Sequence, residues 1–211
     1  KNENFNNLYN GANSVKHNLQ SISEYFNQLS GNIAVFSDFF VDTIRGIPML
    51  VIILYVGLPL AGAVKSASSG YLDMAMMTRG ILAIAIGYSA YMAEIFRAGI
   101  EAVPKGQIEA ARTLGLRDWQ IARLIVIPQA IAIVLPALGN EFIAMLKDTS
   151  LVSILSVRDL TQRMREFQAQ SFLAFEPFNS AALIYVFLTI IAASGIKALD
   201  NIINKSRDHE P

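Results

Sequence analysis

The chain contains no cysteine among its 211 residues. Disulfide bonds and thiolate metal ligands are therefore excluded. The lack of cysteine does not indicate whether the protein works in an oxidising or a reducing compartment. The two histidines, His17 and His209, both lie in polar end segments, so we expect no histidine metal site. The net charge is zero, which offers no basic surface for nucleic acid. The first thirty residues contain no apolar stretch of the kind found in a secretory signal.

Charged residues are also scarce. They make up 16% of the chain, against 53% hydrophobic residues, whereas about a quarter of the residues of a soluble domain are charged. The apolar residues gather in blocks, and a helix needs about 20 mainly apolar residues to cross a bilayer. Four blocks meet this requirement, at residues 46–64, 80–98, 124–146 and 177–197. Buried helices of a large soluble core are the alternative, but such helices rarely stay free of charge over a full bilayer thickness. We therefore expect an all-α membrane protein.

The orientation of these spans follows from the charges between them. The strongest cluster of basic residues lies at the end of the second span and in the loop that leads to the third: Arg97, Lys105, Arg112, Arg117 and Arg123. The positive-inside rule places the loop at residues 101–123 in the cytoplasm. The loop at 66–79 is then external, and the polar tail at 202–211 is cytoplasmic. Residues 1–31 are polar and rich in asparagine, and the transmembrane domain is expected at 32–201.

The cytoplasmic loop has the pattern of two short helices joined by a sharp turn. Pro104 suits the start of a helix, and Gly115 is placed to end that helix in the left-handed conformation. Asp118 is expected to cap the second helix. The small side chains of Ala110 and Ala111 would let another surface approach closely. From the residues alone, a docking element for a cytoplasmic partner and an ordinary amphipathic connector are equally acceptable interpretations.

The spacing within this loop is more specific than its composition. The run EAA at 109–111 is followed after three residues by Gly115, after nine more by Ile125, and then by an Ile-Pro pair at 127–128. This spacing resembles the EAA loop of bacterial ABC importer permeases, with isoleucine where that family usually has leucine before the proline. The blocks RGIPMLV, SAYMAEIFRAGI and LGNEFIAMLKDTS resemble the polar amino acid subfamily. The resemblance extends over roughly residues 36–201.

The resemblance implies the type I fold of binding-protein-dependent importers, with coupling helices that dock on a separate ATPase. The residues expected to couple to that ATPase are Glu109, Ala110, Ala111, Arg112, Leu114 and Gly115. The implied partners are two ATP-binding subunits, a second permease (identical or different), an extracytoplasmic amino-acid-binding protein and the lipid bilayer of the bacterial inner membrane, which the chain would cross several times. Members of this subfamily usually carry a further apolar span before RGIPMLV, and that first span is not visible here.

The chain itself is not expected to be an enzyme. It lacks the G-x-x-x-x-G-K-[ST] loop that holds nucleotide phosphates, so ATP is expected on the partner subunit. We predict no cofactor, no catalytic residue and no metal ligand in this chain.

Ionisable residues inside a span are costly and therefore suggest function. The predicted solute path consists of Glu141, Lys147, Asp148, Thr149 and Ser150. Their donors and acceptors suit the ammonium and carboxylate groups of a zwitterionic amino acid. A pair between Lys147 and Asp148, or a cap of the helix end, is an equally acceptable alternative. Glu94 lies within one turn of Arg97, which favours a structural ion pair between them.

Two other features allow both a functional and a structural interpretation. The external stretch 156–170 is amphipathic, with Leu160, Met164 and Phe167 on one helical face. It suits a gate or a contact for the binding protein, although a solvated interfacial helix is slightly favoured. Pro128 and Pro136 interrupt the backbone hydrogen bonds of the third span, where packing kinks are commoner than hinges.

Other functional classes predict different patterns. A secondary transporter driven by an ion gradient would show inverted repeats, and no self-similarity between halves is visible. An intramembrane enzyme would need paired carboxylates, a metal motif or a nucleophile with its base. A structural membrane subunit that does not transport remains an alternative. The sequence leaves the particular amino acid unnamed.

The orientation is directly testable. A topology probe inserted between Glu109 and Gly115 is expected to react only from the cytoplasmic side, because the basic cluster surrounds this segment. Labelling of that probe from the outside would contradict both the orientation and the coupling interpretation.

Overall fold

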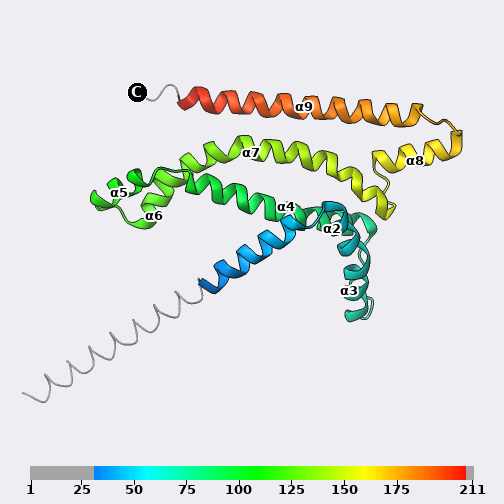
Figure 1. Ribbon diagram of the computed structural model, residues 1–211, viewed down its shortest axis with the longest axis horizontal. Helices are drawn as coiled ribbons and strands as arrows, with labels where there is room; N and C mark the ends of the chain where they lie inside the picture. The colour runs from blue at the N-terminus through cyan, green and yellow to red at the C-terminus, as the bar shows by residue number, and fades with distance from the viewer. Residues whose placement is uncertain (1–30, 208–211) are drawn as a thin grey trace, which may run out of the picture. The chain divides into compact units, whose positions relative to one another are not determined.

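The computed structural model describes the backbone of residues 31–207 and the side chains of residues 31–201 (Figure 1). The chain divides into two compact units, Lys1–Thr43 and Ile44–Pro211. In the first unit, the described residues 31–43 are helical. The predicted polar segment 1–31 lies outside the described residues except for its last residue. Both histidines and the last four residues of the tail also lie outside them.

The described part of the second unit is built from helices, and no strand occurs in it. The elements are α2 (Met49–Tyr55), the π-helical turn η1 (Val56–Leu60), α3 (Ala61–Ala67), α4 (Met76–Glu101), α5 (Lys105–Thr113), α6 (Asp118–Ile121), the π-helical turn η2 (Ala122–Val126), α7 (Ile127–Asp148), the 3-10 helix η3 (Thr149–Leu155), α8 (Leu160–Ser171) and α9 (Glu176–Arg207). The expected all-α class is confirmed.

Four helical runs in the described residues have the length and apolar composition needed to cross a membrane. They are Met49–Ala67, Met76–Glu101, Asp118–Leu155 and Glu176–Asn201. Each overlaps one of the four blocks expected from the sequence. The third run has 38 residues, because α6, η2, α7 and η3 follow one another without a break. It is therefore longer at both ends than the apolar block within it.

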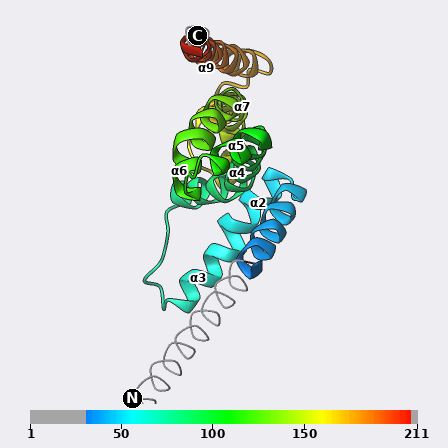
Figure 2. The same cartoon turned by 90° about the vertical axis from the view of Figure 1, so that its left-hand side faces the viewer.

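Helix α7 lies between α4 and α9 and contacts both (Figures 1 and 2). Each contact includes a glycine whose position has no space for a side chain. A methyl group added at Gly99 of α4 would collide with Val134 of α7, and one added at Gly139 of α7 would collide with Ile196 of α9. Lipid is as apolar as the helix surfaces, so membrane helices associate largely through such close packing. The two glycines therefore set the distances between the three longest helices.

A small apolar core joins the ends of the first three spans. Its buried residues come from α2, η1, α4, η3 and the residues after η3: Ile52, Ile53, Val56, Ala83, Val152, Leu155 and Val157. Ile53 is completely buried. The side chains of η3 reach this core because the 3-10 helix follows the last turn of α7 and contacts both α2 and α4. By the orientation expected from the sequence, this core lies toward the external side.

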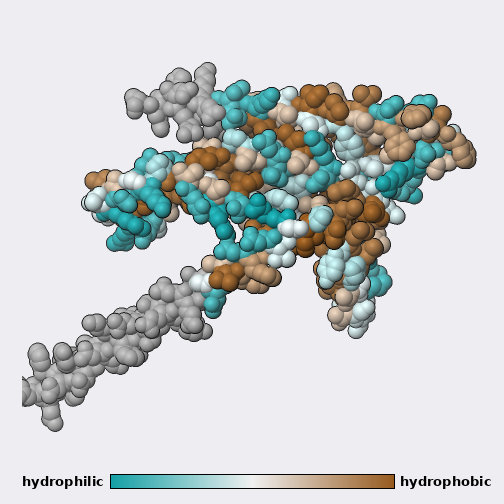
Figure 3. Space-filling model, in the orientation of Figure 1, coloured by the Kyte–Doolittle hydropathy of each residue, from teal (hydrophilic) through white to brown (hydrophobic). Residues whose placement is uncertain are grey.

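The apolar surface outside this core is large. In α9, none of the residues in the most hydrophobic window is buried, and exposed side chains include Leu183, Phe187 and Ile190. Hydrophobic residues also cover much of the face of the molecule shown in Figure 3. A monomeric soluble protein rarely exposes apolar patches of this extent. In a membrane, such side chains face lipid or the helices of another membrane subunit.

Arg79 fixes the connection between the first two spans. Its guanidinium donates to the carbonyl oxygens of Met74 (2.8 Å) and Gly57 (3.1 Å) and pairs with Asp73 at 3.2 Å. Lys65 Nζ lies 2.6 Å from the other oxygen of Asp73. The hydrogen bond from Lys65 lowers the pKa of Asp73. This group of charges ties the end of α3 and the start of α4 to the π turn η1.

The contact between α4 and α7 can be tested at Gly99. Gly99→Ala is expected to destabilise the chain by about 1–3 kcal/mol, because it overpacks a filled contact. Gly195→Ala is the matched control, since no atom lies within 4 Å of the added methyl group and alanine favours the helix by up to about 1 kcal/mol. Thermal unfolding of the purified protein in detergent measures both. The second change Val134→Ala should restore part of the loss, and equal midpoints for the two single variants would contradict the packing argument.

Candidate functional site

The cytoplasmic loop ends its first helix in a Schellman motif. The N–H of Gly115 donates to the carbonyl of Arg112 (3.0 Å), and the N–H of Leu116 donates to that of Ala111 (3.2 Å). These are the two hydrogen bonds that define the motif. Gly115 has a φ of +79°, a left-handed conformation that costs other residues about 1–2 kcal/mol. The predicted conformation of Gly115 is confirmed, and its turn gives the loop one defined shape.

The cap expected for the second short helix is wrong by one residue. Helix α6 begins at Asp118, and Arg117 is the residue before it. The N–H of Arg117 donates to the side-chain oxygen of Gln120 (2.9 Å), which satisfies the helix start without the aspartate. Asp118 instead pairs with Arg112 at 3.3 Å. The carboxylate therefore links α6 to α5, on a surface that is largely exposed.

The loop presents a partly apolar surface. Glu109 and Ala110 are exposed, as are Leu114 (82%) and Trp119 (60%). Ala111 is only 2% exposed, so its methyl group packs inside the chain. The expectation that both alanines admit a neighbouring surface is therefore wrong for Ala111. Its small size serves the packing of the loop itself.

Gln129 joins the loop to the third span. Its side-chain Nε2 donates to Gln107 Oε1 of α5 (2.6 Å) and to the carbonyl of Ile125 in η2 (2.9 Å). The helical hydrogen bonds shift at this π turn, which is followed directly by Pro128 near the start of α7. Gln129 therefore satisfies a backbone oxygen and holds α5 at the same time. Sequence reasoning missed this residue, because the bond to Gln107 joins positions that are 22 residues apart.

The predicted solute-path residues occupy the end of α7 and the start of η3. Glu141 and Asp148 are seven residues apart and lie on one face of α7, and both are partly exposed. Asp148 Oδ2 accepts a hydrogen bond from Tyr88 O–H of α4 at 2.9 Å. No salt bridge joins Lys147 to Asp148 in the described part of the chain, as expected for adjacent residues on a helix. The structure thus gives Asp148 a partner on another span.

The remaining two path residues differ in how their hydroxyl groups are used. Thr149 Oγ1 donates to the carbonyl of Leu146 (2.7 Å), which ties this hydroxyl to its own helix. Ser150 is partly buried. Sequence reasoning missed Tyr88, which is buried and bonded to Asp148; only its place in the block SAYMAEIFRAGI pointed to it.

Glu94 lies on the same helix as Tyr88. Its carboxylate is 3.8 Å from the guanidinium of Arg45, which precedes α2. This ion pair joins the segment before the first span to α4, whereas the pair expected from the sequence, between Glu94 and Arg97, would stay within one helix. Arg45 also lies over the ring of Tyr91, 5.8 Å from its centroid.

The amphipathic external stretch forms α8 and packs on α9. Leu160, Met164 and Phe167 line the same cavity as residues from the start of α9. Asp159 caps the helix, accepting the N–H of Gln162 at 2.8 Å. Thr161 and Tyr185 share a hydrogen bond of 3.1 Å between the two helices. The apolar face of α8 is therefore partly covered, and its exposed face is basic and polar.

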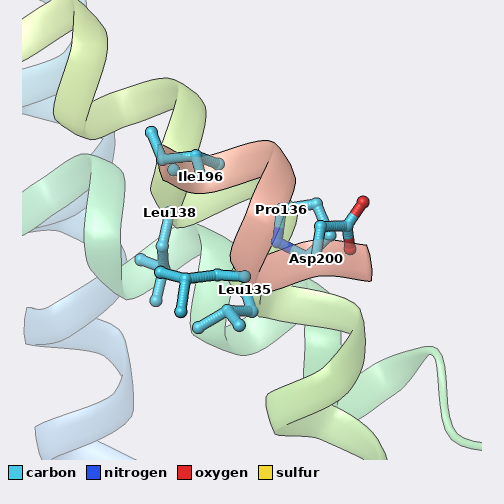
Figure 4. Close-up of a pocket in the computed structure, with 7 residues that line it drawn as sticks. Leu135, Pro136, Leu138, Ile196 and Asp200 are labelled. Carbon is cyan, nitrogen blue, oxygen red and sulfur yellow. The ribbon is translucent and has the colours of Figure 1, made fainter. Parts of the chain in front are cut away.

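An apolar cavity of about 160 Å³ lies between α7 and α9 (Figure 4). Leu135, Pro136 and Leu138 of α7 face Ile196 and Asp200 of α9 around it. Its lining is almost entirely apolar, which does not suit a zwitterionic solute. Within the described residues, no group of three or more metal-ligating side chains comes together.

Comparison with known proteins agrees with this arrangement. The family described as "Binding-protein-dependent transport system inner membrane component" matches residues 25–206. The probable glutamine ABC transporter permease protein GlnM of Bacillus subtilis is 37% identical over 79% of this chain and 74% of its own length. The arginine ABC transporter permease protein ArtQ of Haemophilus influenzae is 33% identical over 76% of this chain and 73% of its own length.

Solved structures show the same fold. A crystal structure of an amino acid ABC transporter with histidines has a TM-score of 0.73 and 38% identity, and the match covers 81% of this chain and 77% of that one. An inward-facing MetNI methionine ABC transporter has a TM-score of 0.64, and the match covers 83% of this chain and 76% of that one. Its identity is only 17%, so this second likeness concerns the fold alone.

Four membrane-length helices with a structured loop between the second and third are the architecture of a multi-pass membrane protein. The chain belongs to the family of binding-protein-dependent transport system inner membrane components. It is an inner-membrane permease, and its relatives are transport subunits. The family and fold expected from the EAA spacing are confirmed.

The joint at Gln129 gives a test of the loop's rigidity. Gln129→Leu removes two hydrogen bonds, each worth about 1 kcal/mol. Amide hydrogen exchange in α5 is therefore expected to become faster, while exchange in α9 stays unchanged. Gln170→Leu is the control, because Gln170 is exposed at the end of α8. Unchanged protection of α5 in the Gln129 variant would show that the joint does not hold the helix.

Proposed function

We propose that this chain is the membrane-spanning permease subunit of an ATP-driven importer for a polar amino acid. The observation that carries the proposal is the cytoplasmic loop, which exposes Glu109 and Leu114 beside a rigid turn at Gly115. The same loop is bonded to α7, the helix that carries Asp148. A partner that moves the loop therefore moves a charged position inside the membrane.

The proposed partners supply the functions that this chain does not perform itself. Two ATP-binding subunits would hold and hydrolyse ATP, so that the permease needs no cofactor and no catalytic residue of its own. A second permease, identical or different, would complete the passage, and an extracytoplasmic binding protein would deliver the amino acid. Relatives named for glutamine and arginine transport support a polar amino acid as the solute.

The coupling surface consists of the side chains that the loop turns outward. Glu109 would meet basic or donor groups of the ATPase, and the exposed Leu114 would enter an apolar depression. Ala110 would allow close approach of the two surfaces. Arg112 and Ala111 would act within the loop, Arg112 through its ion pair with Asp118.

The solute path would run along α7 at Glu141, Lys147, Asp148, Thr149 and Ser150. Half-exposed charges within a span are expected beside a water-filled passage. Tyr88 would hold the carboxylate of Asp148 in place through its hydrogen bond and so orient it toward the ammonium group of the solute. Lys147 is exposed and would attract the solute's carboxylate.

Purification of the chain in its membrane complex tests the coupling. Glu109→Lys reverses an exposed charge, and Gly115→Asp places a charged side chain at positive φ in the turn beside it. Both are expected to abolish co-elution of the ATP-binding subunit. The matched controls are Glu101→Lys, because Glu101 lies outside the docking surface, and Gly70→Asp, which places the same side chain at positive φ in the loop after α3, where an added methyl group meets nothing within 4 Å.

The controls separate docking from folding. Glu101→Lys and Gly70→Asp should retain the ATP-binding subunit, and all four variants should reach the membrane in similar amounts. Retention of the subunit by both Glu109→Lys and Gly115→Asp would count decisively against the proposed function.

A further inference from the structure

A second charged group lies in the membrane region, away from Asp148. It consists of Arg45, Tyr91 and Glu94. The guanidinium of Arg45 is 3.8 Å from the Glu94 carboxylate and 5.8 Å from the centre of the Tyr91 ring. The Tyr91 ring in turn lies 6.0 Å from that of Tyr88, which donates to Asp148. A row of polar groups therefore connects Asp148 to Glu94.

The row follows α4 toward the cytoplasmic loop. Tyr88, Tyr91 and Glu94 are spaced three residues apart, so neighbours in the row are in contact on the helix surface. Six residues of helix correspond to about 9 Å. Glu94 thus lies about 9 Å beyond Tyr88, in the direction of the end of α4 at Glu101. This is the direction that an imported solute takes after it leaves Asp148.

The charges of this group are not buried in protein. The side chains of Arg45 and Glu94 are 41% and 39% exposed. Exposure to lipid would cost several kcal/mol for each charge, so the exposed portions suit water or the polar groups of another membrane subunit. Hydrophilic residues do gather near α4 in Figure 3, between the apolar surfaces of other helices. A water-filled passage along this part of α4 would satisfy both charges.

The ion pair between Arg45 and Glu94 is loose. A tight pair between a guanidinium and a carboxylate has a distance of about 2.7–2.9 Å, whereas the distance here is 3.8 Å. The unused donors of Arg45 suit a carboxylate, and the unused acceptors of Glu94 suit an ammonium group. The face of Tyr91 adds an attraction for a cation. Together these groups match the two opposite charges that every α-amino acid carries on its backbone.

We propose that Arg45, Tyr91 and Glu94 form a second, cytoplasm-proximal binding site for the zwitterionic backbone of the solute. Arg45 binds the α-carboxylate and Glu94 binds the α-ammonium group, while the site does not recognise the side chain of the solute. The site receives the amino acid after Asp148 and before release. This inference rests on the proposed function only in that the row lies along the translocation path.

The test uses a single cysteine, which is specific because the chain has none of its own. Ala98→Cys places the thiol one turn beyond Glu94 on the same face of α4, at an exposed position. The full chain in its membrane complex is treated with a small water-soluble methanethiosulfonate reagent from the cytoplasmic side. Excess glycine is the probe, because it carries the two backbone charges and no side chain. Acetate and methylammonium each carry one of them.

Glycine is expected to slow modification of the thiol several-fold, whereas acetate and methylammonium leave the rate unchanged. Arg45→Gln and Glu94→Gln should each abolish this protection, and Arg45→Lys should retain part of it. Glu101→Gln is the control that removes a charge from the same helix and should retain full protection. Thermal unfolding of every variant identifies any that has merely lost its fold.

Two results would overturn the inference. One is a thiol that does not react, since the row would then face no water. The other is a reactive thiol that glycine does not protect, or protects equally well after Arg45→Gln and Glu94→Gln. Loss of the proposed function is seen separately, as co-elution of the ATP-binding subunit that survives Glu109→Lys, and that result leaves glycine protection unaffected.

Discussion

Close packing of helix on helix is the constraint on which the rest of this structure depends. Inside a bilayer, lipid competes equally for apolar side chains, so burial alone does not hold the spans together. The chain meets this constraint at Gly99 and Gly139, where the absence of a side chain lets α7 approach α4 on one side and α9 on the other. Once those distances are set, the Tyr88 hydroxyl reaches Asp148 across the contact between α4 and α7. The position of Asp148 relative to α4 thus depends on the close helix packing at Gly99 and Gly139.

The second demand of the bilayer is that each backbone group finds a partner within the protein. In the described residues, π turns shift the regular helical bonds at two places, η1 and η2. At each place a side chain donates to a carbonyl of the π turn: Arg79 to Gly57 (3.1 Å) and Gln129 to Ile125 (2.9 Å). Both donors also bind a second element, so a local irregularity becomes a fixed joint between segments. Single π turns within helices are frequent at functional sites, and here one of them adjoins the cytoplasmic loop.

The sequence predicted the features that depend on local order. The four spans follow from uninterrupted apolar length, and the turn at Gly115 follows from the need for positive φ at the end of α5. The features that it missed depend on contacts between distant residues. Nothing near Asp118 shows that its carboxylate is engaged by Arg112, nothing near Ala111 shows that its methyl group is buried, and the bond from Tyr88 to Asp148 joins positions 60 residues apart. Spacing identified the family, whereas the partners of individual side chains required the fold.

These contacts also connect the loop between α4 and α7 to Asp148. Gln129 fixes α5 to the start of α7, and Asp148 lies 19 residues further along the same helix, about 28 Å away. A helix transmits displacement along its axis, so a shift of the loop alters the height of Asp148 relative to α4. The Tyr88–Asp148 hydrogen bond spans that boundary at 2.9 Å, and a slide of even 1 Å between the two helices would weaken it, because hydrogen bonds of this kind tolerate little extension. The strength of this hydrogen bond therefore depends on the relative position of α4 and α7, and any shift between the two helices changes how firmly Tyr88 holds the carboxylate.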